Sequence, residues 1–238
     1  ISQARNMFDA PSEVITAATG DAPALRRRGR PAVDTAHAID ESVFLAAAFS
    51  MFAERGYDAT TLRELARDLG VSHNLLNVRF GLKANLWRAA VDWRMVEAST
   101  SVVAAFDGEG DAEQRLRDLV RRFCEWATEN RDIVAISYHE GQRDSWRLEY
   151  IVQTFIRPFQ VRLDALIDEV RAVRPVHALS TTALMALLVQ GVGFYFAARP
   201  LQIRLGKTSD TSRETELVEA RQFANFLIGG LLTADRQT

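Results

Sequence analysis

The sequence contains little of what disulfide-stabilised or metal-dependent proteins need. Cysteine occurs once, at Cys124, and four histidines are scattered over the 238 residues. A single cysteine cannot form an internal disulfide, which predicts a reducing, cytoplasmic environment. No histidine pairs with a second ligand at zinc-site spacing, and no nucleophile elbow or phosphate-binding loop is found. We therefore expect no metal and no cofactor.

Long hydrophobic runs and an excess of one charge are also missing. The longest apolar stretch, residues 183–198, is interrupted by Gln190 and is shorter than the ~20 residues that cross a bilayer. It predicts a buried helix and no membrane partner. Lysine and arginine together number 29 against 31 aspartates and glutamates, a formal net charge of -2. Any binding of nucleic acid must therefore come from a local basic patch.

Residues 1–38 differ in composition from the rest of the chain. Proline and glycine are frequent there, apolar periodicity is weak, and the segment ends in a basic cluster. This pattern predicts a flexible arm. Within the cluster, Arg28-Gly29-Arg30-Pro31 resembles the core of minor-groove AT-hooks, in which Arg28 and Arg30 would enter a narrow A·T groove. The alternative is a basic tail that makes nonspecific contacts.

From Asp40 onward, apolar residues recur at helical spacing, and glycine, serine and threonine mark the helix ends. The pattern predicts an all-α protein of about nine helices, with no convincing strand and no internal repeat. Pro158 should bend the long helix that contains it, and residues 199–212 should form a polar loop. We expect helices over about 40–55, 61–69, 72–79, 83–105, 116–127, 131–142, 145–173, 180–198 and 214–233.

Residues 61–80 fit two short helices that cross closely. Ala66 provides the small side chain that the crossing needs, and Gly70 tolerates the left-handed backbone of a tight turn. Val71 and Leu76 can then hold the second helix against the first. The pattern is typical of a helix-turn-helix, although a plain helical hairpin with a solvated outer face fits it equally well.

The flanking sequence favours the helix-turn-helix. Residues 47–91 resemble the N-terminal domain of the TetR family of transcriptional regulators. The resemblance is carried by Phe52-Ala53-Glu54-Arg55-Gly56-Tyr57, Ala59-Thr60-Thr61, Leu65-Ala66, Gly70-Val71-Ser72, Phe80, Lys83 and Leu86. It implies a three-helix DNA-binding domain over residues 39–88 and a larger helical effector-binding and dimerisation domain over residues 89–238.

The chain departs from the family on the helix that would read DNA. His73 and Asn74 stand where the family commonly has a lysine and a glycine. Asn77, Val78 and Arg79 stand where it often has a tyrosine and an aromatic or histidine pair. The packing positions are kept, so the fold should follow the family, whereas the DNA sequence that is bound should differ.

The resemblance also implies which side chains contact double-stranded DNA. Phosphate contacts are implied at or near three helix starts, where free amides favour anions, for Thr60, Thr61, Arg63, Ser72 and Lys83. Base-edge or phosphate contacts are implied on the second short helix for His73, Asn74, Asn77 and Arg79, with Val78 against a thymine methyl group. For Lys83 the alternative is a solvated surface charge.

The larger part of the chain would bind a second subunit and an effector. The resemblance implies a homodimer in which residues 180–198 and 214–233 form a four-helix bundle with their twins, as suits a palindromic operator. A pocket between the middle helices would hold a small, largely apolar effector. Its candidate lining residues are Phe123, Trp126, Tyr138, His139, Trp146, Tyr150, Phe155, Gln190 and Phe194. For each of them, the alternative is ordinary core packing or a solvated surface position.

Three functions are compatible with these patterns. The first is a repressor that a ligand releases from its operator. The second is a DNA-binding regulator without an effector, or an activator. The third is a helical enzyme, which the sequence supports least, because the adjacent His139 and Glu140 would point roughly 100° apart on a helix. Cys124 lies on an apolar helical face and is expected in the core.

Overall fold

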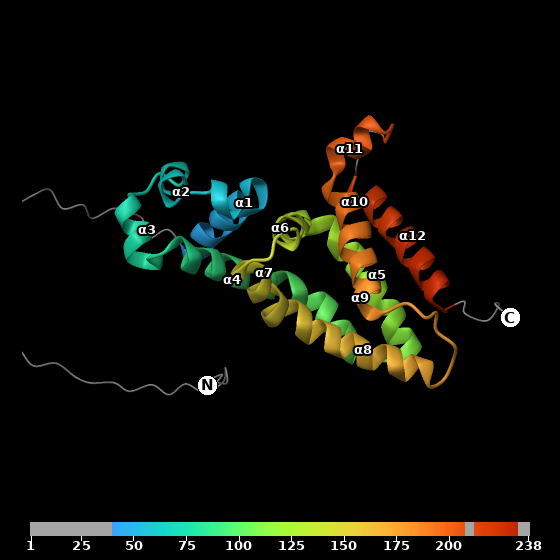
Figure 1. The fold of residues 1–238 in the computed structure, drawn as a ribbon. Coiled ribbons are helices and arrows are strands. Elements are labelled where there is room, and N and C mark those ends of the chain that lie inside the picture. The colour runs from blue at the N-terminus through green and yellow to red at the C-terminus, as the bar shows by residue number, and fades with distance from the viewer. Residues whose placement is uncertain (1–39, 208–211, 233–238) are drawn as a thin grey trace, which may run out of the picture. The chain divides into compact units, whose positions relative to one another are not determined.

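The computed structural model describes residues 40–207 and 212–232. Within these ranges the chain is helical and contains no strand, which confirms the all-α class (Figure 1). None of the helices within these ranges has both the length and the apolar composition needed to cross a bilayer. Arg28 and Arg30 lie outside the described residues, so their roles stay predictions.

The first three helices lie together with the start of the fourth (Figure 1). They are α1 (Glu41–Ala59), α2 (Leu62–Asp68), α3 (His73–Phe80) and α4 (Lys83–Val103). Buried side chains from all four, among them Phe49, Leu65, Leu76 and Trp87, form one hydrophobic cluster. The same cluster includes Ile133 and other residues from further along the chain. The core of the small domain thus continues into the larger part, and a boundary after residue 88 stays a prediction.

Nearby side chains cap the starts of the two short helices α2 and α3, as the sequence predicts. The Thr61 hydroxyl accepts a hydrogen bond from the Glu64 N–H at 3.2 Å, and the Glu64 carboxylate accepts one from the Thr61 N–H at 3.1 Å. This reciprocal capping box satisfies two amides that the first turn of α2 leaves unpaired. Ser72 caps α3, and Gly70 forms the turn between the helices with φ 65°. The predicted helix-turn-helix geometry is therefore present.

Most of the remaining described helices form a second bundle, in which α5 packs against both α12 and α8, while α6 also packs against α1. Its core contains Leu116, Leu163, Leu184 and Ile228. The elements are η1 (Ala104–Asp107), α5 (Ala112–Glu129), α6 (Arg131–Gly141), α7 (Trp146–Ile151), η2 (Val152–Ile156), α8 (Arg157–Arg171), α9 (Thr181–Ala186), η3 (Leu187–Gly193), α10 (Phe194–Ala197), α11 (Arg199–Arg204) and α12 (Arg213–Leu232).

Two of these helices contain a π-helical segment. α7, η2 and α8 form one continuous helix, with Pro158 in the first turn of α8. Because proline has no N–H and its ring crowds the preceding turn, the wider turns of η2 relieve the clash. The structure therefore has a π segment before the proline, and the bend at Pro158 stays a prediction. In the second helix, Gly193 lies so close to α6 that an added Cβ would be 3.0 Å from Val134.

The polar loop predicted over residues 199–212 is wrong for its first part, because Arg199–Arg204 form α11. Pro200 lies in the first turn, where its fixed φ suits a helix and its missing N–H costs no hydrogen bond. The sequence offers no buried face to reveal this helix: Leu201 and Ile203 are both exposed in the isolated chain.

Candidate DNA-binding surface and effector cavity

The outer face of α3 carries uncharged side chains. Leu76 is fully buried. Asn74 and Val78, two positions before and after it, lie on the opposite face because each residue turns the helix by roughly 100°. Both are exposed, and Val78 is 77% exposed. At the flank, the Asn77 amide nitrogen lies 3.1 Å from Nδ1 of His73. Four of the predicted DNA-contacting residues thus share one exposed helix.

Arg79 faces α1 and not the outer side of α3. Its guanidinium donates to the Glu41 carboxylate at 2.9 Å and lies 5.2 Å from the centre of the Phe44 ring. These contacts join the last turn of α3 to the first turn of α1. The geometry suits Arg79 to holding α3 in place more than to reading base edges.

Three candidate phosphate contacts lie where the sequence places them. Arg63 is exposed in the first turn of α2 and forms no ion pair with another described residue. Thr61 and Ser72 are the exposed caps of α2 and α3, the two helix starts. Both hydroxyls already accept the N–H of their own first turn, so the remaining amides of these helix starts are the groups available to a phosphate.

Thr60 and Lys83 have a different use from the one predicted. Thr60 is 2% exposed, and its hydroxyl donates to the Gly56 carbonyl at 2.9 Å. The Lys83 Nζ donates to the carbonyls of Tyr57 at 2.9 Å and Thr60 at 3.0 Å, and it lies 4.1 Å from the centre of the Tyr57 ring. Burial lowers the pKa of Lys83.

Both side chains therefore donate to backbone carbonyls near the end of α1. A phosphate role for the Thr60 hydroxyl is wrong, because that hydroxyl points inward. Lys83 stabilises the segment between α1 and α2. Two of its three N–H groups are used there, so one is left for another acceptor.

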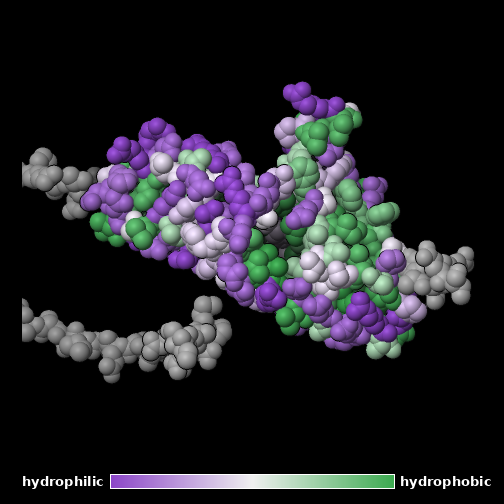
Figure 2. All heavy atoms as spheres, viewed as in Figure 1, coloured by the Kyte–Doolittle hydropathy of each residue, from purple (hydrophilic) through white to green (hydrophobic). Residues whose placement is uncertain are grey.

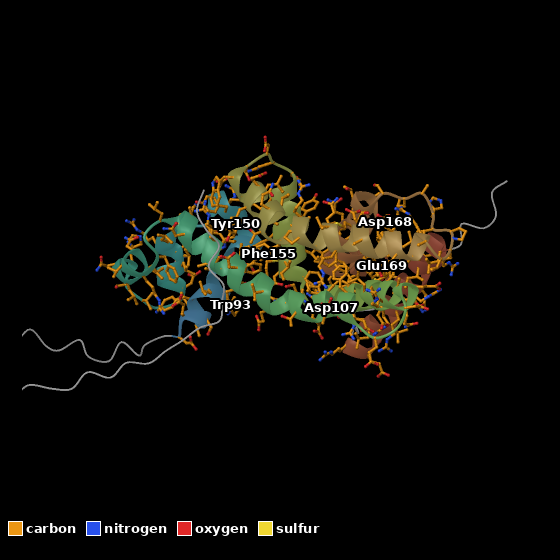
Figure 3. The ribbon with its side chains drawn as sticks, turned by 90° about the horizontal axis from the view of Figure 1, so that it is seen from below. Trp93, Asp107, Tyr150, Phe155, Asp168 and Glu169 are labelled. Carbon is orange, nitrogen blue, oxygen red and sulfur yellow. The ribbon has the colours of Figure 1, made fainter. Side chains whose placement is uncertain are left out.

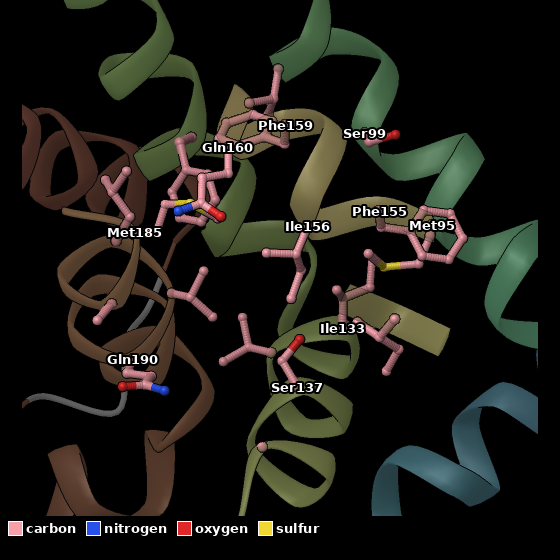
Figure 4. Close-up of a pocket in the computed structure, with 18 of the residues that line it drawn as sticks. Met95, Ser99, Ile133, Ser137, Phe155, Ile156, Phe159, Gln160, Met185 and Gln190 are labelled. Carbon is pink, nitrogen blue, oxygen red and sulfur yellow. The ribbon is translucent and has the colours of Figure 1, made fainter. Parts of the chain in front are cut away.

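A cavity of about 560 Å³ opens between the helices from α4 to α10 (Figure 4). Apolar and aromatic side chains dominate its wall, with Met95, Ile133, Phe159 and Met185 among them (Figure 4). Ser137 and Gln190 are two of its few polar groups. The predicted lining residues that the structure places there are Phe123, Trp126, Tyr138, Phe155, Gln190 and Phe194.

His139, Trp146 and Tyr150 do not line this cavity, so these three predictions are wrong. His139 is exposed on α6. The rings of Trp146 and Tyr150 lie 5.3 Å and 6.0 Å from that of Trp87 on α4. Figure 3 shows Tyr150 in this region, near Phe155. Trp146 and Tyr150 therefore lie on a helix that contributes to the cavity, but their rings pack against α4 and not into the cavity.

The two charged residues of the cavity wall are both ion-paired. Glu140 accepts hydrogen bonds from Arg147 at 2.9 Å, and both side chains are almost fully buried. Arg162 donates to Asp107 at 2.7 Å. The wall therefore offers a ligand apolar surface and a few neutral polar groups, with each charge already neutralised by a neighbour.

The Glu140–Arg147 pair also connects the cavity to the helix-turn-helix. The Arg147 guanidinium lies 4.4 Å from the centre of the Tyr57 ring, whose other neighbours include Trp146 at 5.8 Å. Tyr57 is the residue whose carbonyl Lys83 holds. A continuous set of contacts thus runs from the cavity wall to the end of α1. The sequence does not reveal this set of contacts, because Glu140 and Arg147 face each other across a turn that no motif marks.

Groups for covalent or metal-assisted catalysis are scarce in the described residues. No three His, Cys, Asp or Glu side chains there lie close enough together to hold a metal ion. Cys124 is fully buried in the core, as expected, and burial raises the pKa of its thiol to about 12. A thiol with that pKa stays protonated and is a poor nucleophile.

Comparison with known proteins agrees with this geometry. Residues 44–90 match the sequence model of the family described as bacterial regulatory proteins, tetR family. The chain is 28% identical over 80 residues to the uncharacterized HTH-type transcriptional regulator YezE of Bacillus subtilis strain 168. That match covers 34% of this chain and 41% of YezE, less than half the length of either protein.

Similar solved structures extend the likeness to most of the chain. The ketosteroid transcriptional regulator KstR2 of Mycobacterium tuberculosis has a TM-score of 0.60 at 19% identity, over 80% of this chain and 93% of that one. The fatty acid degradation regulator FadR from Bacillus halodurans has a TM-score of 0.57 at 15% identity, over 79% and 97%. At these identities, the likeness shows a shared fold.

Proposed function

The chain belongs to the tetR family of bacterial regulatory proteins, and from this premise we propose that it is a cytoplasmic repressor. Two copies bind a palindromic operator through α3 and leave it when a small apolar molecule fills the cavity. The observation that carries this proposal is the buried Glu140–Arg147 pair, in which Glu140 lines the cavity and Arg147 contacts Tyr57 at the end of α1.

Unpartnered apolar side chains on two helices support a homodimer. On α12, Val218 and Phe226 are 46% and 80% exposed, and on the helix formed by α9, η3 and α10, Leu187 and Phe194 are 45% and 40% exposed. Figure 2 shows hydrophobic residues gathered over this part of the molecule. A twin four-helix bundle would cover them and set two α3 helices to face two half-sites.

Release would follow from the contacts between the cavity and α1. A ligand that fills the cavity pushes against α6 and α7, which hold Glu140 and Arg147. Movement of Arg147 would displace Tyr57 and the end of α1, and with it the position of α3 relative to its twin. By linkage, DNA must then weaken ligand binding by the same factor as the ligand weakens DNA binding.

The chemistry of the wall favours a neutral ligand. Glu140 and Arg162 are both paired, so an anionic or cationic ligand would have to break an existing ion pair. A buried charge without a partner is costly. Because structural relatives are named for ketosteroids and for fatty acid degradation, a neutral ketosteroid is the first probe and a fatty acid of similar length is its charged counterpart.

The other two functions have less support. A regulator without an effector does not explain a cavity of about 560 Å³ whose wall is connected to the end of α1 through Glu140, Arg147 and Tyr57. Activation in place of repression would depend on where the operator lies relative to a promoter. For an enzyme, no three metal-ligating side chains of the described residues lie together, and the Cys124 thiol is buried in the core.

The experiment has two steps. The purified protein first selects duplexes from a random library at physiological salt, and a two-fold symmetric consensus is expected. The fluorescence anisotropy of the selected duplex is then followed while the ketosteroid or the fatty acid is added. The neutral probe should release the DNA at lower concentration than the acid. A folded dimer that selects no consensus would contradict DNA reading, and preferential release by the acid would contradict a neutral effector.

A further inference from the structure

The cations around α3 are engaged elsewhere in the protein. Arg79 is held by Glu41 and the Phe44 ring, and Lys83 donates to two carbonyls of α1. Recognition of guanine in the major groove most often uses an arginine or lysine paired with its O6 and N7 atoms. The outer face of α3 offers no such side chain. If this helix reads bases, it reads them without the common guanine contact.

The groups that this face does offer match A·T pairs. Val78 is 77% exposed, and Asn74 lies one turn before it on the same side of α3. Leu75, beside Asn74, is 37% exposed. In the major groove the C5-methyl group of thymine is a distinctive apolar feature, and the adenine edge accepts a bidentate contact from an asparagine. An exposed valine one turn from an exposed asparagine is complementary to such a pair of neighbouring bases.

The other polar side chains of α3 are partly committed. The Asn77 amide lies 3.1 Å from His73 Nδ1, which uses one hydrogen-bonding position of each side chain. Asn74 has no such partner among the described side chains, so its amide keeps both a donor and an acceptor for one base. Asn74 is therefore the best-placed bidentate reader on the helix.

We infer that each half-site is A·T-rich at the base pairs under α3, with Val78 against a thymine C5-methyl group and Asn74 paired with an adenine beside it. This inference rests on the proposed function, because it names the DNA sequence class that the same surface recognises. The face of α3 thus acts as a reader of thymine methyl groups and adenine edges, while Arg63 at the start of α2 stays available to the backbone phosphates.

The test begins with the duplex that the wild-type protein selects from a random library. Each thymine of a half-site is replaced in turn by deoxyuracil, which removes only the C5-methyl group. At one position the wild-type affinity should fall about 3- to 5-fold, as expected for the loss of one buried methyl contact. The Val78→Ala protein should bind both duplexes equally, whereas Val78→Thr, which keeps one methyl group, should retain part of the preference.

A second variant tests the adenine contact. Asn74→Ala should lose about 10-fold in affinity for the selected duplex and should accept other base pairs at the neighbouring position. Asn74 and Val78 are exposed, so neither variant should change the melting temperature, and a thermal melt serves as the control for folding.

The outcomes separate this inference from the proposed function. A symmetric consensus with G·C pairs under α3, or wild-type binding that ignores every thymine-to-uracil change, would overturn the A·T reading while DNA binding stands. Failure of the folded dimer to select any consensus would overturn both. A uracil effect that persists unchanged in Val78→Ala would assign the methyl contact to another residue and would also overturn the inference.

Discussion

The outer face of α3 and the wall of the cavity use their polar groups in opposite ways. On α3, Asn74 is exposed and keeps its hydrogen-bonding groups available. Around the cavity, Glu140 and Arg162 are each paired with a neighbouring charge. A surface that reads base edges must leave donors and acceptors open, whereas a pocket for an apolar molecule must have its charges satisfied before the ligand arrives. The difference indicates what each site can bind.

The largest expected effect comes from breaking the buried pair. Arg147→Met leaves the Glu140 carboxylate buried without its partner, which should lower the free energy of unfolding by about 3–5 kcal/mol. Urea denaturation measures it. The double variant Glu140→Gln with Arg147→Met should recover part of the loss, because neither charge then remains. Asn74→Ala is the matched comparison on α3 and should change stability by less than about 0.5 kcal/mol. If Arg147→Met and Asn74→Ala lowered the free energy of unfolding equally, the buried pair and the exposed face of α3 would not differ as described.

The next effect concerns the apolar surface that the isolated chain leaves open. Phe226→Glu places a charge at the position that is 80% exposed on α12 and should convert the dimer into monomers. Operator affinity should then fall about 100-fold, because two half-sites are no longer bound together. Sedimentation velocity and DNA titration measure the two results. Val96→Glu, at a 62% exposed position on α4, is the control and should remain dimeric. A dimeric Phe226→Glu protein would place the interface elsewhere.

A smaller effect distinguishes two possible roles of Arg79, which are to hold α3 in place and to read a base. Arg79→Ala removes the contact with Glu41 and should weaken binding to all duplexes alike, by about 1 kcal/mol, with the base preferences unchanged. Titration against the selected duplex and its single-base variants measures this. A changed preference at one base pair would show that Arg79 leaves Glu41 and reads a base.

The sequence predicts the helix-turn-helix better than the cavity because its determinants are local. Thr61, Glu64 and Gly70 act within a few residues of one another, so their spacing alone indicates the caps and the turn. The partners of Lys83 are backbone carbonyls 23 and 26 residues away, which no side-chain pattern reveals. The sequence alone therefore predicts a phosphate role for Lys83 and does not reveal this contact.

The cavity shows the same limit at the level of helix faces. Tyr150 and Phe155 both lie in the predicted long helix, yet Phe155 lines the cavity and Tyr150 packs against Trp87. A difference of about one turn determines which way an aromatic ring points, and both environments are apolar. Hydrophobic periodicity identifies a buried face but cannot tell a filled core from a cavity.

If filling the cavity weakens the binding of α3 to DNA, a substitution that fills it should have the same effect without any ligand. Ser137 lies on the cavity wall (Figure 4), so Ser137→Phe would place a ring in the space that an effector would take. Ser101→Phe, at an exposed position of α4, is the control. Operator affinity of the folded, dimeric Ser137→Phe protein should fall at least 10-fold, a coupling of about 1.4 kcal/mol, while Ser101→Phe binds as the wild type does. Unchanged affinity in a Ser137→Phe protein whose crystal structure shows the ring inside the cavity would contradict the coupling.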